Sequence, residues 1–219
     1  MDPTELAEAP SPEAIFSEAE LAARVNSPYV VGVVDAGIEN GVPFLVQRYV
    51  DGVDLQELVD RSPELLSTAA VTRIVSDVAR GLTAIHRAGV VHRDIKPENV
   101  FLVEDADGVY PKLFDFGLSK AVGRTPGRQL KSVIPTADNH ITGTPEYMSP
   151  EQARGLADVD QRTDVWSMGV MLFELLTGHF PFHAENVGDL LVKILTQDAP
   201  KLSVYRPDLG PRFEAYIAR

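Results

Sequence analysis

The stretch from His92 to Asn99 reads His-Arg-Asp-Ile-Lys-Pro-Glu-Asn, and Asp115-Phe116-Gly117 follows sixteen residues after Asn99. A β-rich segment precedes each motif, so both lie where a predicted strand ends. Carboxylate and amide oxygens are ligands that suit Mg²⁺. A nearby lysine places a positive charge where phosphoryl oxygens gain negative charge. Together these residue types indicate metal-assisted phosphoryl transfer, in which the protein positions groups and neutralises charge.

The composition narrows the class of protein. The 219 residues include 20 basic and 32 acidic side chains, a formal net charge of −12, which argues against a nucleic-acid-binding protein. The chain has no cysteine, so disulfides, thiolate metal sites and cysteine nucleophiles are excluded. No apolar stretch has the length of about 18 residues that a membrane helix needs, and the first residues lack the pattern of a secretory signal. We therefore expect a cytoplasmic protein without a membrane segment in this chain.

The first half of the sequence predicts an acidic tail, a small β-rich part and a long helix. Residues 1–14 contain three prolines and no basic residue, which is typical of a solvated tail. Asn40-Gly41 between two β-rich runs predicts a hairpin. The expected elements are a helix from about Phe16 to Ser27, strands over 29–38 and 42–50, a short helix over 55–59 and a long helix over 68–88.

The second half returns to short strands and then becomes helical. The pattern predicts strands over 90–92, 100–103 and 112–114, a loop over 119–147, and helices over 163–177 and 187–195. The helix over 163–177 is apolar on most faces, so we expect it at the centre of its domain. The order of elements predicts an α+β fold, with a small β part before a larger helical part.

The motifs and their order resemble those of the eukaryotic-type protein kinases, including the bacterial serine/threonine branch. Residues 92–99 match the catalytic loop of that family, and residues 115–117 match its metal motif. Ser149-Pro150-Glu151 occupies the place of its Ala-Pro-Glu motif, and Asp164-Val-Trp-Ser-Met-Gly resembles the start of its central helix. The resemblance implies a bilobal protein-kinase-like fold, with a partial small lobe over 15–50 and a mostly helical large lobe over 51–219.

The resemblance also implies roles for individual residues. Asp94 would orient or accept the proton of a substrate hydroxyl, and Lys96 would meet the transferred phosphoryl group, which favours serine or threonine substrates. Asn99 and Asp115 would hold Mg²⁺ on the nucleotide phosphates. His92 and Phe116 are interpreted as packing residues. Thr144 and Arg93 are expected in the substrate and activation segment, where Arg93 would pair with a phosphorylated residue; the candidate phosphosites are Ser132, Thr136 and Thr142.

The nucleotide site is expected at the end of the second β-rich run. Gln47 falls where the family places its gatekeeper residue, and residues 48–50 would form the hinge whose backbone meets adenine. We therefore expect Arg48, Val50, Asp54 and Glu98 to contribute to nucleotide binding, with Asp54 as the acid that contacts the ribose. The implied ligands are ATP and Mg²⁺, and the implied partner is a protein substrate; the sequence leaves the oligomeric state open.

The sequence departs from the family pattern near both ends. Family members carry a Gly-rich phosphate loop and a strand lysine, yet Gly32 is the first glycine and Lys96 the first lysine of this chain. Glu18, or Glu20 if the register shifts, is where the glutamate that pairs with the strand lysine is expected. The chain ends at Arg219, before the last helices of the family. We therefore expect a kinase domain incomplete at both ends.

Two functions follow from these observations. The first is a Ser/Thr protein kinase that transfers the γ-phosphoryl group of ATP to protein hydroxyls, because Asp94, Lys96, Asn99 and Asp115 are all present. The second is a catalytically inert kinase-like interaction module, because residues 1–95 contain no lysine. A metal-binding or hydrolytic protein would explain the aspartates but not the ordered motifs after residue 140. For this chain alone we expect weak nucleotide binding and poor phosphotransfer.

Overall fold

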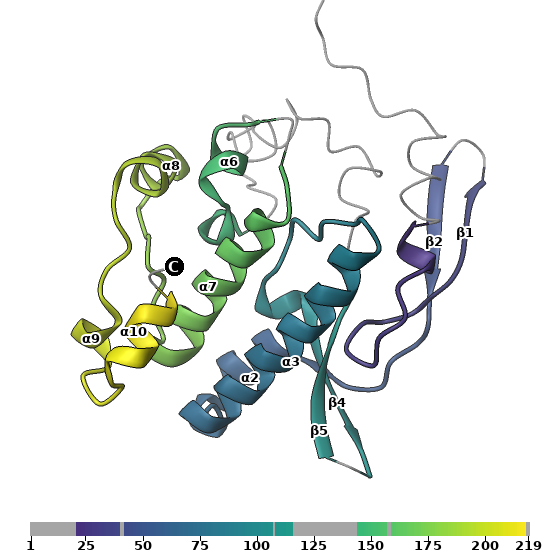
Figure 1. Cartoon of the computed structure of the whole chain (residues 1–219), viewed down its shortest axis with the longest axis horizontal. Coiled ribbons are helices and arrows are strands. Elements are labelled where there is room, and N and C mark those ends of the chain that lie inside the picture. The colour runs from purple at the N-terminus through teal and green to yellow at the C-terminus, as the bar shows by residue number, and fades with distance from the viewer. Residues whose placement is uncertain (1–20, 40–41, 107, 116–143, 157–158, 218–219) are drawn as a thin grey trace, which may run out of the picture.

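The computed structural model describes residues 21–39, 42–106, 108–115, 144–156 and 159–217 (Figure 1). A β-hairpin lies at one side of the molecule, and most of the helices lie at the other. The predicted tail over 1–14, the start of the first predicted helix, Glu18, Glu20 and the Asn40-Gly41 turn fall outside the described residues. The end of that first helix is seen, because residues 21–23 are helical.

The predicted hairpin is confirmed as the antiparallel pair β1 (Val33–Glu39) and β2 (Val42–Gln47). Its register places Ile38 opposite Pro43 and Val33 opposite Gln47, with an irregularity between Val33 and Asp35. Strand β2 ends earlier than predicted. The next residue, Arg48, still donates its backbone N–H to Gly32 O at 2.8 Å, and the chain then leaves the hairpin.

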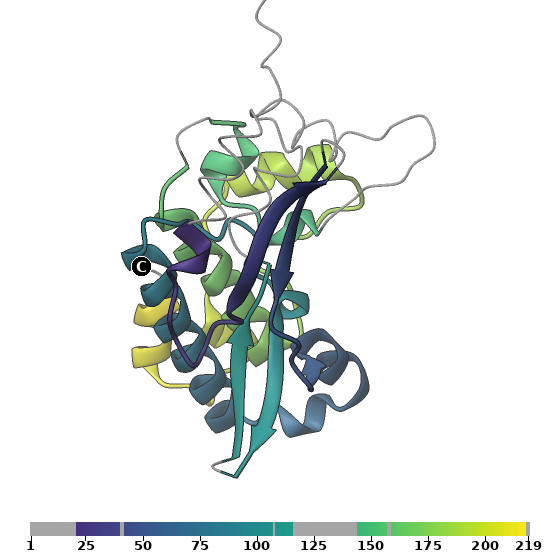
Figure 2. The same cartoon turned by 90° about the vertical axis from the view of Figure 1, so that its right-hand side faces the viewer.

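A second sheet has the order β3 (Val53–Asp54), β4 (Val100–Asp105), β5 (Gly108–Leu113), and all its pairs are antiparallel. Strand β5 begins earlier than predicted. Gly108 has a φ of 114°, a conformation open to glycine, so the chain reverses tightly and pairing resumes at once. Val30 forms a parallel bridge with Leu113, which connects the segment before β1 to this sheet (Figure 2).

Two helices follow β3, and side-chain caps explain where each begins. Asp54 accepts a hydrogen bond from the Glu57 N–H at 2.8 Å and starts α2 (Leu55–Arg61). After a short 3₁₀ turn, η1 (Pro63–Leu65), Ser67 accepts from the Ala70 N–H at 3.3 Å and starts α3 (Thr68–Arg87). Both helices confirm the sequence prediction.

The prediction of a strand over 90–92 is wrong. These residues belong to no helix or strand. The N–H of Val90 donates to Ile85 O at 3.2 Å, and the N–H of His92 donates to the Asp164 carboxylate at 2.9 Å. Because these donors are used by the end of α3 and by a side chain, no strand partner is required.

The rest of the described chain is helical. A 3₁₀ turn at Pro145–Tyr147 lies within the stretch predicted as a loop, whose residues 119–143 are outside the described part. The predicted helices over 163–177 and 187–195 are confirmed, whereas α6, α9 and α10 were not predicted. The bounds are η3 (Pro145–Tyr147), α6 (Pro150–Ala153), α7 (Arg162–Thr177), α8 (Val187–Thr196), α9 (Leu202–Tyr205) and α10 (Pro211–Ile217).

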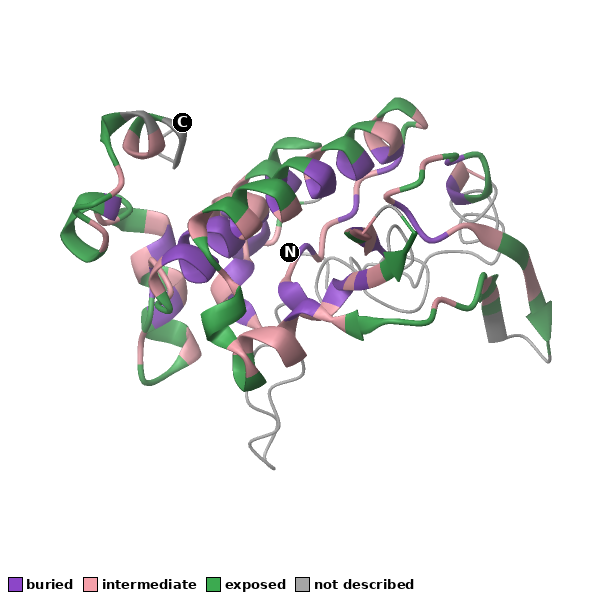
Figure 3. Ribbon diagram, turned by 90° about the horizontal axis from the view of Figure 1, so that it is seen from below, coloured by how far each residue is buried: buried purple, intermediate pink, exposed green. Residues whose placement is uncertain are grey.

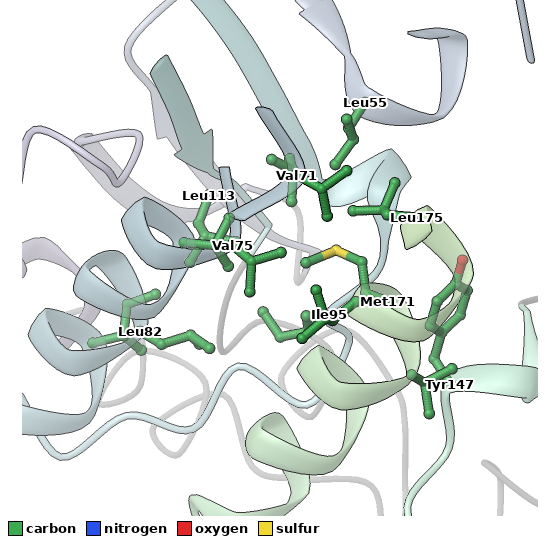
Figure 4. Close-up of a cluster of buried hydrophobic side chains, with 14 of the residues drawn as sticks. Leu55, Val71, Val75, Leu82, Ile95, Leu113, Tyr147, Met171 and Leu175 are labelled. Carbon is green, nitrogen blue, oxygen red and sulfur yellow. The ribbon is translucent and has the colours of Figure 1, made fainter. Parts of the chain in front are cut away.

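The larger of two hydrophobic clusters joins α2, α3 and α7 to the second sheet, and Figure 3 shows the buried residues concentrated along the inner sides of the helices. As predicted, α7 lies at the centre of this core. Ile95, in the His92–Asn99 loop, is fully buried in the same cluster (Figure 4). The loop that carries the chemical motif is therefore anchored by packing. The labelled members of the cluster are Leu55, Val71, Val75, Leu82, Ile95, Leu113, Tyr147, Met171 and Leu175.

The close approach of α3 to the Val30 segment predicts opposite effects for two Gly→Ala changes. A Cβ at Gly81 would lie 2.8 Å from Tyr29 O and 3.1 Å from Leu113 Cδ1, so Gly81→Ala should lower the free energy of unfolding by about 1–3 kcal/mol. A Cβ at Gly169, in α7, meets nothing within 4 Å, and Gly169→Ala should raise it by up to about 1 kcal/mol. Urea denaturation of both variants measures the difference. Equal effects would contradict the proposed contact.

Candidate active site

The backbone of the His92–Asn99 loop takes a conformation that needs support. Arg93 has a φ of 67°, in the left-handed region, where a non-glycine residue is strained. Its N–H donates to Asp164 Oδ1 at 2.6 Å, and its carbonyl accepts from Gln152 Nε2 at 2.8 Å. Two helices distant in sequence, α7 through Asp164 and α6 through Gln152, thus hold the N–H and the carbonyl group of Arg93.

Asp164 is the centre of that support. Its carboxylate, in the first turn of α7, is fully buried. Oδ2 lies 2.7 Å from His86 Nε2 and accepts the His92 N–H at 2.9 Å, while Oδ1 accepts the Arg93 N–H. Several donors to one buried carboxylate offset the cost of removing it from water. The arrangement ties α3, the loop and α7 together.

The reactive groups converge at the next residues of the loop. Lys96 Nζ lies 3.1 Å from Asp94 Oδ2, and Asn99 Nδ2 donates to the same oxygen at 3.0 Å. Asn99 Nδ2 also donates to the Asp94 backbone carbonyl at 2.6 Å, which fixes the amide relative to the carboxylate. Within the described part of the chain, Asp94 Oδ1 receives no hydrogen bond, and the Asp94 side chain is 27% exposed.

His92 connects this loop to the end of β5. The ring is fully buried, and Nε2 lies 3.2 Å from Phe114 O, an acceptor, so Nε2 carries the proton. Nδ1 then accepts the Asp94 N–H at 3.4 Å. Burial lowers the pKa of His92 despite the opposing charges of Asp164, Asp94 and Asp115. The neutral ring fills the space between the loop and the end of β5 and contacts both, which agrees with its interpretation as a packing residue.

Asp115 follows β5 and has a φ of 60°. Its carboxylate is exposed and forms no hydrogen bond or ion pair within the described residues. The structure places Asp115 near enough for its charge to act on His92, which itself contacts the Asp94 backbone. The remainder of the motif, Phe116 and Gly117, lies outside the described residues.

The residues present fit Mg²⁺. Asn99 uses its amide nitrogen toward Asp94, so its carbonyl oxygen is available, and Asp115 offers a carboxylate. Among the described residues no three His, Cys, Asp or Glu side chains form a metal cluster. Mg²⁺ does not require one, because it commonly takes one or two carboxylates together with phosphate oxygens and water.

Three of the predicted nucleotide residues, Arg48, Val50 and Asp54, lie at the joint between the hairpin and the second sheet, whereas Glu98 lies in the His92–Asn99 loop. Arg48 uses its N–H within the fold, but the Arg48 carbonyl and the Val50 N–H have no hydrogen-bond partner among the described residues. Asp54 caps α2, a role that was not predicted, and its expected contact with ribose stays a prediction. The gatekeeper position, Gln47, has a buried Nε2 without a partner.

Thr144 and Glu98 contact each other, which was not predicted. Thr144 Oγ1 donates to Glu98 Oε1 at 3.3 Å, and the structure records no bond from Thr144 to Asp94 or Lys96. Glu98 Oε2 is buried without a partner. The candidate phosphosites Ser132, Thr136 and Thr142 lie outside the described residues, so the pairing expected for Arg93 stays a prediction.

Sequence analysis missed several supporting residues. Tyr147 donates a short, buried hydrogen bond to Glu174, and burial raises the pKa of both groups. His86 and Gln152 were also missed. The Ser-x-x-Gln pattern of Ser149 and Gln152 is a capping box, and this signal would have indicated the start of α6.

Comparison with known proteins identifies the family of the chain. The family model described as "Protein kinase domain" matches residues 3–209. Serine/threonine-protein kinase PknL of Mycobacterium tuberculosis is 39% identical over 202 residues, which are 92% of this chain and 47% of that protein. Serine/threonine-protein kinase pkn3 of Myxococcus xanthus is 40% identical over 208 residues, 92% of this chain and 37% of that protein. The crystal structure of the Mycobacterium tuberculosis PknI kinase domain matches with a TM-score of 0.69 at 30% identity, covering 100% of this chain and 74% of that one.

A loop with an aspartate, a lysine and an asparagine, beside a second aspartate after a strand, on this fold, is the arrangement that the protein-kinase family implies. The chain belongs to the eukaryotic-type protein kinase family, in its bacterial serine/threonine branch. It has the protein-kinase fold, and it spans less than half the length of these curated relatives. In the described ranges no helix is long and apolar enough to span a membrane.

The contacts of Asp164 predict a large effect of a small change. Asp164→Asn replaces one acceptor oxygen with an NH₂ group that faces a donor, so the free energy of unfolding should fall by about 2–4 kcal/mol. Amide hydrogen exchange at His92 and Arg93 should accelerate. Asp160→Asn, at an exposed carboxylate paired with Arg162, is the control and should leave stability nearly unchanged. Similar stabilities for the two variants would overturn the role assigned to Asp164.

The raised pKa of Glu174 predicts a pH-dependent difference in stability. Burial disfavours its charged form, so above the ordinary value of 4.5 the unfolded chain releases a proton that the folded chain keeps. Glu174→Gln removes this effect and keeps an acceptor for Tyr147. The variant should gain stability relative to the wild type as pH rises from about 4.5, until the folded pKa is passed. Thermal unfolding between pH 4 and 8 measures the stability of the variant relative to the wild type. Glu185→Gln, at an exposed position, is the control. A relative stability that falls as pH rises would refute the account.

Proposed function

We propose that this chain acts as a serine/threonine protein kinase, which transfers the γ-phosphoryl group of ATP to a protein hydroxyl. The observation that carries the proposal is the arrangement around Asp94. Oδ2 is held by Lys96 and Asn99, and Oδ1 is left open. An oriented carboxylate with one free oxygen is what a positioned acceptor of a hydroxyl proton requires.

Each residue of the site has a separate role in the proposed reaction. Asp94 Oδ1 orients the substrate hydroxyl and receives its proton as the hydroxyl oxygen bonds to phosphorus and ADP departs. Lys96, fixed by its ion pair with Asp94, places positive charge beside the group in transfer. Asn99 and Asp115 would hold Mg²⁺, which neutralises phosphate charge when bound. Thr144 and Glu98, joined by a hydrogen bond, border the approach of the protein substrate.

Adenine would bind at the hinge after β2. The Arg48 carbonyl and the Val50 N–H form an acceptor and a donor two residues apart, without partners among the described residues. Such a pair suits the donor and acceptor edge of adenine and leaves the side chains of the hinge free to vary. Asp54 is proposed to reach the ribose in addition to capping α2, and Glu98 to border the nucleotide. Assignment of residues 15–50 to a small lobe and 51–219 to a large lobe, and a cytoplasmic location, likewise stay proposals.

The second candidate function is an inert kinase-like interaction module. The observation that raises it is that residues 1–95 contain no lysine, since one preorganised charge donor is typically worth about 10²–10³-fold in rate. The relatives that this chain resembles bear the name of serine/threonine-protein kinases, which favours the first candidate.

Phosphotransfer by the chain itself distinguishes the two candidates. With γ-labelled ATP, Mg²⁺ and dephosphorylated casein as a general acceptor, we expect slow labelling of serine and threonine. Asp94→Asn should reduce the rate by about 10²–10⁴-fold, because the oxygen that orients and deprotonates the hydroxyl is lost. Exposed Asp198→Asn is the matched control and should retain the rate.

Calorimetric titration with ATP and Mg²⁺ completes the test. Asp115→Asn should weaken binding, whereas Asp94→Asn should change it little. Equal rates for the wild type and Asp94→Asn would refute the role of Asp94. A folded wild type without any transfer would favour the inert module.

A further inference from the structure

The solvent face of α3 differs in charge from the rest of the protein. Its exposed positions hold three arginines, three hydroxyl residues and one alanine, and no carboxylate; they are Ala69, Thr72, Arg73, Ser76, Arg80, Thr83 and Arg87. The one acidic residue of the helix, Asp77, is 5% exposed. A face free of acidic side chains is notable in a chain with a net charge of −12.

The three arginines form a straight row. They recur every seven residues, so each lies about 20° around the helix from the last and about 10.5 Å along it. Together they span about 21 Å of one side of α3, the long helix labelled in Figure 1. We name Arg73, Arg80 and Arg87 the α3 arginine row.

The three arginines of the row differ in whether their guanidinium groups already form hydrogen bonds or ion pairs within the protein. Arg80 Nη1 lies 2.6 Å from Asp77 and 3.3 Å from the Tyr29 hydroxyl, so it is held in place by the fold. Arg73 and Arg87 form no hydrogen bond or ion pair within the described residues. The charges at the two ends of the row are therefore available to a partner.

Among the described residues, the acidic side chains that follow the contacts at the two ends of α3 pair with arginines outside the row. At the beginning, Arg206 bonds Thr68 and pairs with Asp208 at 2.7 Å. At the other end, Asp160 pairs with Arg162 at 2.9 Å, beside Gln161, whose side chain reaches His86 O. Each of these carboxylates already has its own arginine.

We propose that the α3 arginine row is a docking surface for an acidic helical segment of a partner protein, with carboxylates at the same seven-residue spacing. Charge complementarity supports this occupant, because such a segment would place one carboxylate opposite each arginine. An anionic membrane or a nucleic acid is a poorer fit, since its extended negative charge would also face the remaining acidic surface of the chain.

Binding of a designed peptide tests the surface. The probe is a fluorescent alanine-based helical peptide with glutamate at three positions seven residues apart, and its counterpart has glutamine there. Fluorescence anisotropy should detect binding of the glutamate peptide at about 10 mM salt, weakened at about 0.15 M, and little binding of the glutamine peptide.

Charge reversal at the ends of the row provides the decisive comparison. Arg73→Glu with Arg87→Glu should weaken binding by about fivefold or more, while Arg80 stays in place to preserve its contacts with Tyr29 and Asp77. Arg154→Glu with Lys201→Glu changes the net charge equally at exposed positions elsewhere and should have little effect. Circular dichroism checks that both variants fold.

Other results would overturn the proposal. Absence of binding to the wild type, or equal weakening by the two double variants, would show that the row is not a specific surface. Equally tight, arginine-dependent binding of single-stranded RNA or of vesicles containing phosphatidylserine would show that the partner class is wrong. None of these measurements depends on phosphotransfer.

Discussion

The buried carboxylate of Asp164 is the constraint on which the site depends. It lies in the first turn of the most buried helix and bonds two consecutive backbone N–H groups of the His92–Asn99 loop. A buried carboxylate without partners would cost several kcal/mol, so these donors and His86 are required for α7 to bury this end. In the same contacts, the loop acquires a conformation that its own sequence does not favour, with Arg93 at a φ of 67°. Such strain typically costs about 1–3 kcal/mol and persists because the surroundings determine it.

Packing and polar contacts act together to position Asp94. The preceding residue is held by Asp164 and Gln152, and the following residue, Ile95, is fully buried in the core. Because both neighbouring residues are held, the backbone of Asp94 is restrained. The ion pair with Lys96 and the hydrogen bond from Asn99 then orient its carboxylate. A site built in this manner takes its precision from the large helical part, so the geometry of Asp94, the proposed proton acceptor, does not depend on the β1–β2 hairpin.

Sequence patterns predicted the elements whose signals are local. The hairpin, α2, α3, α7 and α8 follow from turn chemistry and periodicity, and the site residues Asp94, Lys96 and Asn99 are brought together as their motif implied. Signals that depend on distant residues were missed. The donors of residues 90–92 bond the end of α3 and Asp164, so a strand-like composition did not produce a strand. The pairing of Tyr147 with Glu174 joins residues 27 positions apart, and no local pattern indicates it.

The distribution of charge is consistent with the proposed transfer of a negatively charged phosphoryl group by an acidic chain. Around the reactive carboxylate, positive charge comes from Lys96, and the buried His92 stays neutral because burial lowers its pKa. If His92 were charged, its proton on Nδ1 would oppose the Asp94 N–H that this atom accepts. Neutrality of the ring therefore preserves the loop geometry, and Lys96, which pairs with Asp94, is the cation proposed to meet the phosphoryl group. The arginines of the proposed docking surface on α3 share no residue with the proposed site of phosphoryl transfer, so we expect mutations to alter the two independently.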